Sequence, residues 1–189
     1  MTFAVLAALA ALVAGMSLLL SRPQEAFAAS VTILDQPTCE SIGGSFSGST
    51  CTIDDLTVNG TDIVTIATGI TLDVTGTITN NGGITNNGTI NITNAGKIEN
   101  NAVGIITNNA GGNIHNSLGN IHNNNGTIIN DNGGSIHNSP GGTIINDEFG
   151  TIDNFGGTII NDGSIINDDG NFINNAGGEI NNDGYFPQH

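Results

Sequence analysis

The stretch GTIINDEFGTIDNFGGTIINDG, from Gly142 to Gly163, states nearly the same short phrase three times. In each copy a glycine stands two residues before an isoleucine, and an asparagine stands two residues after it. Repetition at so short a period is typical of chains that build one small structural unit per copy and stack the units. The fold is therefore predicted from this phrase.

The phrase G-x-I-x-N recurs in sixteen units of six to eight residues across the second half of the chain. Glycine precedes every unit centre by two positions, and asparagine follows fourteen of the first fifteen centres; Ile92 is the exception. The centres are Ile78, Ile84, Ile90, Ile98, Ile106, Ile114, Ile121, Ile128, Ile136, Ile144, Ile152, Ile159, Ile165, Phe172, Ile180 and Phe186.

Each unit reads as a short β-strand followed by a turn. Alternate side chains of a strand share a face, so the isoleucine and the asparagine two residues later point to the same side. Glycine and asparagine tolerate the positive φ angles that tight turns require. A glycine content this high disfavours helix, and the period is not helical.

One such strand cannot bury its isoleucine alone, whereas stacked coils can. The sequence therefore predicts an all-β protein, a parallel β-helix or β-solenoid, with isoleucine stacked on isoleucine inside. Asparagines would form ladders at the corners, each amide bonding to those above and below. Because GTIIND begins at Gly126, Gly142 and Gly157, skipping one unit each time, the pattern favours two strands per coil; three per coil is the alternative.

The stretch ITLDVTGTITNNGGITNNGTI, Ile70 to Ile90, resembles the repeats of secreted parallel β-helix surface proteins of prokaryotes, including adhesin-like ones. The resemblance covers residues 52–186. It implies the architecture and not one function, because β-solenoids serve as adhesins, sheaths, lyases and ice-binding proteins alike.

The chain is predicted to contain a signal peptide (1–28), an entry segment (29–55), a solenoid repeat domain (56–186) and a short tail (187–189). Residues 4–20 form an uncharged apolar run, and Ala26-Phe27-Ala28 offers a cleavage site; an uncleaved membrane anchor is the alternative. In an exported chain, the pair Cys39 and Cys51 predicts a disulfide that brackets the entry segment.

The net charge is −15, and Lys97 is the only lysine or arginine after residue 28. Such a chain cannot neutralise phosphates, so we expect no nucleic-acid partner and, once the signal peptide is cleaved, no membrane partner. The expected partners are cations, other components of a surface or matrix, and further copies of the chain.

Three sets of outward side chains are candidate sites if there are two strands per coil. Stacked carboxylates that repel one another would favour Ca²⁺, and a mixed histidine and aspartate column would suit zinc or copper. A Thr/Ile stripe would suit an interface, either between rods or with ice. Calcium is predicted at Asp131, Asp147 and Asp162, a transition metal at His122, His137 and Asp153, and the stripe at Thr127, Ile129, Thr143, Ile145, Thr158 and Ile160.

Each set has a plainer interpretation: a solvated acidic edge, a polar surface ladder, or β-branched residues that simply suit strands. The acidic turns resemble those of RTX-type β-rolls but lack their G-G-x-G-x-D pattern.

The sequence as a whole predicts a secreted or cell-surface, non-catalytic structural or adhesive protein. Ligand-binding solenoids, for ice or glycans, are the alternative. β-Helix polysaccharide lyases resemble the architecture but generally need a basic residue, and only Lys97 remains for that role.

Overall fold

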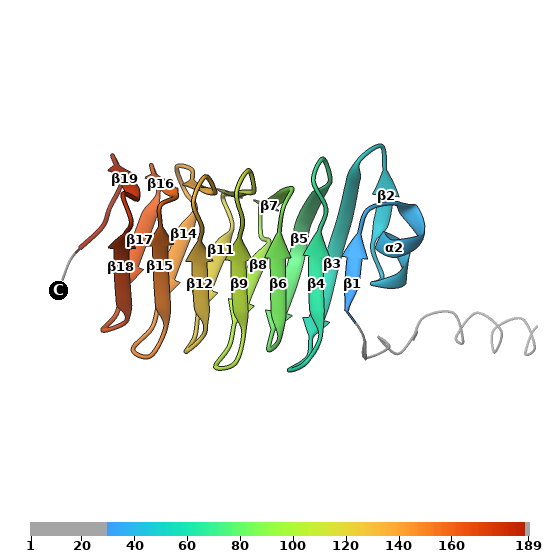
Figure 1. Ribbon diagram of the computed structural model, residues 1–189, viewed down its shortest axis with the longest axis horizontal. Coiled ribbons are helices and arrows are strands. Elements are labelled where there is room, and N and C mark those ends of the chain that lie inside the picture. Colours follow the sequence, from blue (N-terminus) through green and yellow to red (C-terminus); the bar gives the residue numbers. More distant parts are fainter. Residues whose placement is uncertain (1–29, 188–189) are drawn as a thin grey trace, which may run out of the picture.

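A computed structural model of the protein describes residues 30–187. Its strands wind around one long axis in stacked coils, which form a straight rod (Figure 1). The predicted signal peptide, residues 1–28, lies outside the described residues. Among the described helices, none is long and apolar enough to cross a membrane.

The rod has three long faces, which we call A, B and C. Face A is a seven-stranded parallel sheet, and faces B and C are the two halves of a second sheet that bends where β3 (Thr50–Val58) and β5 (Thr71–Asn80) pass from one half to the other.

The remaining strands each belong to one face. Face A contains β1 (Val31–Ile33), β4 (Ile63–Ile66), β6 (Gly83–Asn86), β9 (Ile105–Asn108), β12 (Thr127–Asn130), β15 (Thr151–Phe155) and β18 (Asn171–Asn175). Face B continues with β7 (Thr89–Thr93), β10 (Asn113–Ser117), β13 (Ser135–Asn138), β16 (Thr158–Asn161) and β19 (Glu179–Asn182). Face C continues with β8 (Lys97–Asn100), β11 (Asn120–Asn123), β14 (Thr143–Asn146) and β17 (Ser164–Asn167).

Each coil contains three strands, one on each face. Ile84 of β6 pairs with Ile106 of β9, and two further strands, β7 and β8, lie between them in the chain. The predicted β-solenoid is confirmed, but the prediction of two strands per coil is wrong and the alternative of three holds. Strands β4 to β18 of face A mark six coils, so this part of the rod rises about 24 Å at the usual strand spacing.

The interior consists of isoleucine columns. The centres from Ile78 to Ile165 have at most 4 % of their surface exposed, and each lies in register with the centre of the next coil. A narrow apolar cavity runs between the columns from Ile98 to Phe172. Burial of these side chains supplies most of the driving force for folding, at about 25 cal/mol for each Å² removed from water.

Asparagine ladders run beside the isoleucine columns, as the sequence predicts. The Nδ2 atom of each ladder asparagine donates to Oδ1 of the asparagine one coil later, at 2.7–2.8 Å. A second bond from Nδ2 reaches a backbone carbonyl of the next coil, as from Asn108 to Ser135. Eleven asparagines in these ladders are completely buried, so the bonds offset a desolvation cost that would otherwise be prohibitive.

From Gly104 to Gly178, the glycine that opens each unit makes room for the ladder. A Cβ atom on Gly134 would lie 2.7 Å from Oδ1 of Asn130 and 2.7 Å from the carbonyl oxygen of Asn108. Any side chain at this position would therefore displace the buried amides.

A helix and a hairpin cover the N-terminal end of the rod. Helix α2 (Gln36–Ser41) begins with a capping box between Asp35 and Thr38, and β2 (Ser45–Ser47) pairs antiparallel with β3. The Cys39–Cys51 disulfide joins α2 to β3 with an S–S distance of 2.03 Å, which confirms the predicted bridge. Both sulfurs are buried, so the disulfide fastens the cap to the core.

The C-terminal end is less covered than the N-terminal end. Phe172 and Phe186 pack with their ring centroids 4.9 Å apart against the last coil, while Tyr185 stays exposed. The final strands β18 and β19 are consequently the most exposed of the rod.

Candidate functional site

The surface of the rod is organised as columns of outward side chains. Each four-residue strand points its first and third residues outward, and the parallel register stacks them on the equivalent residues of the next coil. A column therefore joins residues three units apart in the sequence. This rule decides which predicted site residues meet.

The predicted calcium column is not formed. Asp131 follows β12 on face A, Asp147 follows β14 on face C, and Asp162 follows β16 on face B, so the three aspartates lie at three different corners. The aspartates that follow paired strands of adjacent coils are Asp147 with Asp168 and Asp162 with Asp183. Within residues 30–187, no three His, Cys, Asp or Glu side chains are grouped as metal ligands.

The predicted transition-metal column is also separated. His122 lies on face C, His137 on face B and Asp153 on face A. The prediction assumed that alternate units share a face, whereas a coil contains three units.

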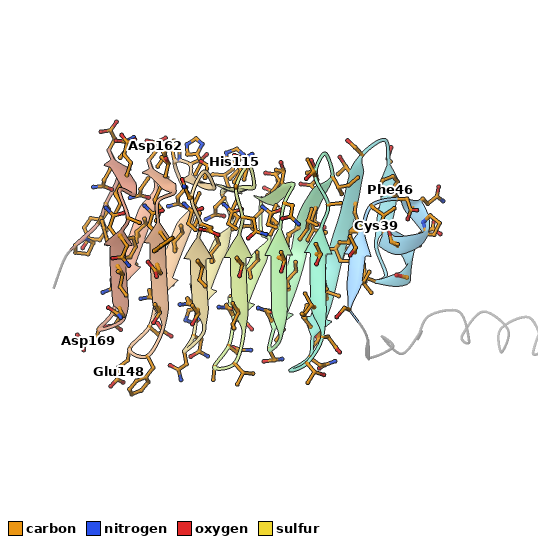
Figure 2. All side chains as sticks on the ribbon, in the orientation of Figure 1. Cys39, Phe46, His115, Glu148, Asp162 and Asp169 are labelled. Atoms are coloured by element: carbon orange, nitrogen blue, oxygen red, sulfur yellow. A yellow bond between two sulfur atoms is a disulfide. The ribbon has the colours of Figure 1, made fainter. Side chains whose placement is uncertain are left out.

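The histidines instead make local contacts between adjacent coils. His115 and His137 stack with their ring centroids 5.1 Å apart, and Nε2 of His115 lies 2.8 Å from the hydroxyl of Ser139. Nε2 of His137 lies 3.0 Å from Asp162, and Nε2 of His122 lies 2.7 Å from Asp147. Figure 2 shows His115 and Asp162 along one edge of the rod and Glu148 and Asp169 along the opposite edge.

Burial and the neighbouring His137 both lower the pKa of His115 below its ordinary value, burial being the larger cause. At neutral pH the neutral form of His115 is therefore favoured, which suits its stacking on His137.

The predicted Thr/Ile stripe is divided among the faces. Thr127 and Ile129 lie on face A, Thr143 and Ile145 on face C, and Thr158 and Ile160 on face B. A different column takes its place: Thr32, Thr65, Thr85 and Thr107 stack in register on face A, followed by Ile129. The signal for it was present in the sequence as threonines 20 and 22 residues apart, which only a three-unit coil aligns.

Lys97, the base considered for a lyase, forms a salt bridge with Glu99 on the same strand of face C. It stands on a flat strand surface between outward residues of adjacent coils, Thr77 and Asn120. Its surroundings are those of a surface ion pair and not of a proton-abstracting base in a cleft.

The fold defines a class of protein, the parallel β-solenoids. No family model matches the sequence, and no curated protein matches it. Among solved structures, the chain is similar to the TibC-catalysed, hyper-glycosylated TibA55-350 fragment, at 18 % identity and a TM-score of 0.21. The match covers 80 % of this chain and 65 % of that fragment, so this chain spans just under two thirds of it.

Proposed function

We propose that the protein is a non-catalytic structural rod at the cell surface or outside the cell, with an adhesive role toward other surface or matrix components. The observation that carries this proposal is the continuity of the three asparagine ladders. They join adjacent coils from Asn80 on face C, Asn86 on face A and Asn116 on face B to the last coil, through hydrogen bonds that are buried in all but the last rungs. A side-chain network satisfied in this way makes a stiff element, which suits a structural part better than an enzyme that opens and closes.

The shape of the rod supports the same proposal. Active sites are usually concave, with a few polar groups that converge on a pocket. The cavity described above is lined by isoleucines and Phe172 alone and belongs to the core. The outward polar groups are spread along flat faces, a distribution that favours contact with another extended surface.

The disulfide supports a location outside the cytosol. Structural disulfides persist in oxidising compartments and are rare in the cytosol of ordinary cells. The Cys39–Cys51 bridge fastens the N-terminal cap, so a fully fastened cap requires an oxidising environment.

The experiment follows the full chain in the cell that produces it. Intact cells are labelled with an antibody against residues 30–187, the redox state of the two cysteines is trapped with a thiol reagent, and attachment of cells with and without the chain is compared. We expect labelling without permeabilisation, an oxidised cysteine pair and weaker attachment when the chain is missing. A chain confined to the cytosol with free thiols would contradict the proposal, as would unchanged attachment.

A further inference from the structure

The part of face A from β4 to β12 carries no charge on its outward side, and β15, the next strand, carries Asp153. The outward positions of β4, β6, β9 and β12 carry no charged residue, although the chain as a whole has a net charge of −15. These positions are Ile63, Thr65, Gly83, Thr85, Ile105, Thr107, Thr127 and Ile129. On faces B and C the corresponding positions include Asp73, Lys97 and Glu99. Whatever contacts face A between β4 and β12 therefore meets a neutral surface.

The threonine hydroxyls in the middle of face A are also unoccupied. The hydroxyls of Thr65, Thr85 and Thr107 have no hydrogen-bond partner within residues 30–187. Polar groups at the third residue of face B strands, by contrast, have partners: Asn91 donates to Asp73, and His115 contacts Ser139, which follows β13. The hydroxyls of face A remain free for water or for a ligand.

Face A is regular and flat. Its strands lie in a row with little change of direction (Figure 1), and their parallel register repeats each outward position at about 4.8 Å. Flat sheets of this extent are unusual, and here the buried ladders keep the strands aligned. The face thus presents hydroxyl and methyl groups at one fixed period.

Two occupants of such a face are disfavoured. A second copy of the chain would cover a flat area of about 250 Å² on these four strands of four residues, whereas each partner buries about 800 Å² in a standard stable interface. Glycan recognition usually relies on exposed aromatic rings as stacking platforms, and the outward positions from β4 to β12 offer none.

We propose that the part of face A from β4 to β12 binds ice, with the threonine column as the centre of the contact. Ice is uncharged and periodic, so a rigid periodic array of hydroxyl and methyl groups can hold a layer of water in a lattice-like arrangement. Charged groups would instead orient water around themselves. The preformed array also avoids the entropy cost of ordering side chains and loops on contact. This proposal does not depend on the adhesive role.

The test measures thermal hysteresis and partition into growing ice for the full chain and for two single variants. Thr85→Lys places a charge in the middle of face A. Thr79→Lys is the matched control, because Thr79 occupies the equivalent outward position of face C on β5. Far-UV circular dichroism and the unfolding midpoint establish that both variants keep the fold, and light scattering gives their mass.

We expect the wild type and Thr79→Lys to partition into ice and to depress the freezing point below the melting point. Thr85→Lys should fall to the level of buffer alone. The proposal is overturned if the folded wild type shows neither effect, or if the two variants lose activity equally. It is also overturned if Thr85→Lys only dissociates a dimer that has no ice activity, because face A would then be an interface between two copies.

Discussion

The side-chain amide of Asn108 donates a 2.8 Å hydrogen bond from Nδ2 to Oδ1 of Asn130, which lies directly above it in the next coil. Both side chains are completely buried, and Asn130 in turn donates to Asn154. The ladder is therefore a chain of bonds in which each member is both donor and acceptor. Removing one member leaves its neighbours without partners in a place that water does not reach.

Replacing a middle member of the ladder should be costly. Asn130→Leu keeps approximate volume but leaves Oδ1 of Asn154 and one hydrogen of Asn108 unpaired. At about 1–3 kcal/mol for each unpaired buried group, we expect unfolding in urea to show a loss of about 3–5 kcal/mol. The matched control is Asn182→Leu in the exposed last rung, where a loss of about 1 kcal/mol or less is expected. Equal losses in the two variants would contradict the claim that buried amide hydrogen bonds stabilise the rod.

The glycine of each unit should tolerate no side chain. Gly134→Ala would place a methyl group 2.7 Å from Oδ1 of Asn130, and we expect the unfolding midpoint to fall clearly. Gly60→Ala is the control, because its nearest neighbour would be the carbonyl oxygen of Asn81 at 3.8 Å and no positive φ is required. We expect this second variant to match the wild type or to be slightly more stable, as less flexible chains lose less entropy on folding. A Gly134→Ala protein as stable as Gly60→Ala would refute the steric explanation.

Reduction of the disulfide should loosen the cap before the rod. Closing a loop of this length contributes about 3 kcal/mol in the chain-entropy model, and the cysteines are 12 residues apart. In solenoids each coil contacts only its neighbours, so the effect should spread little along the axis. Hydrogen exchange on Cys39→Ala/Cys51→Ala should therefore show faster exchange in α2 and β2 and nearly unchanged protection in β9 to β14. Uniform loss of protection along the rod would contradict this expectation.

Stability should decline as the pH falls through the range in which His115 is protonated. The pKa of His115 is lowered from 6.5 by burial and by the stacked His137, which is itself bound to Asp162. The unfolded chain therefore takes up a proton at a higher pH than the folded chain does. The contribution of neutral His115 to the free energy of unfolding is complete above about pH 6.5, and it is lost as the pH falls toward the pKa of His115 in the folded chain.

The variant His115→Asn removes this group and keeps a polar side chain, as Asn91 provides at the preceding position of the column. We expect the slope of unfolding free energy against pH, between about pH 7 and pH 5, to be shallower in the variant. Identical slopes in the variant and the wild type would show that other groups cause the dependence.

The repeat phrase predicts the buried isoleucines and the asparagine ladders, because each follows from which side of a strand a residue occupies. The phrase glycines are predicted to supply positive φ angles, whereas none of those that open a unit has one, and the structure gives them a steric role instead. Even the exception is informative. Ile92 lies opposite Asn116 in register, so the ladder of face B begins only at Asn116, whose Oδ1 has no hydrogen-bond partner. The sequence shows that Ile92 departs from the phrase. Only the strand pairing shows that the ladder of face B therefore begins one coil later, at Asn116.

The candidate sites could not be predicted in the same way. Every column depends on the number of strands per coil, and the alternation of similar units at Gly126, Gly142 and Gly157 indicated two. In the structure those three units lie on faces A, C and B. They are alike because each forms the same kind of strand, and not because they stack on one another. An error of one strand per coil moved each predicted metal ligand to a different corner and divided the Thr/Ile stripe.

The measurement that tests the central claim most directly is a spin–spin distance between pairs of labels on outward positions. A three-strand coil places Thr107 next to Ile129 on face A, and it places His122 on face C. A two-strand coil would instead stack position 107 on position 122. We predict strong dipolar broadening for labels at 107 and 129, which are about one strand spacing apart, and weak broadening for labels at 107 and 122. The reverse result would contradict the three-faced rod and, with it, the threonine column on face A.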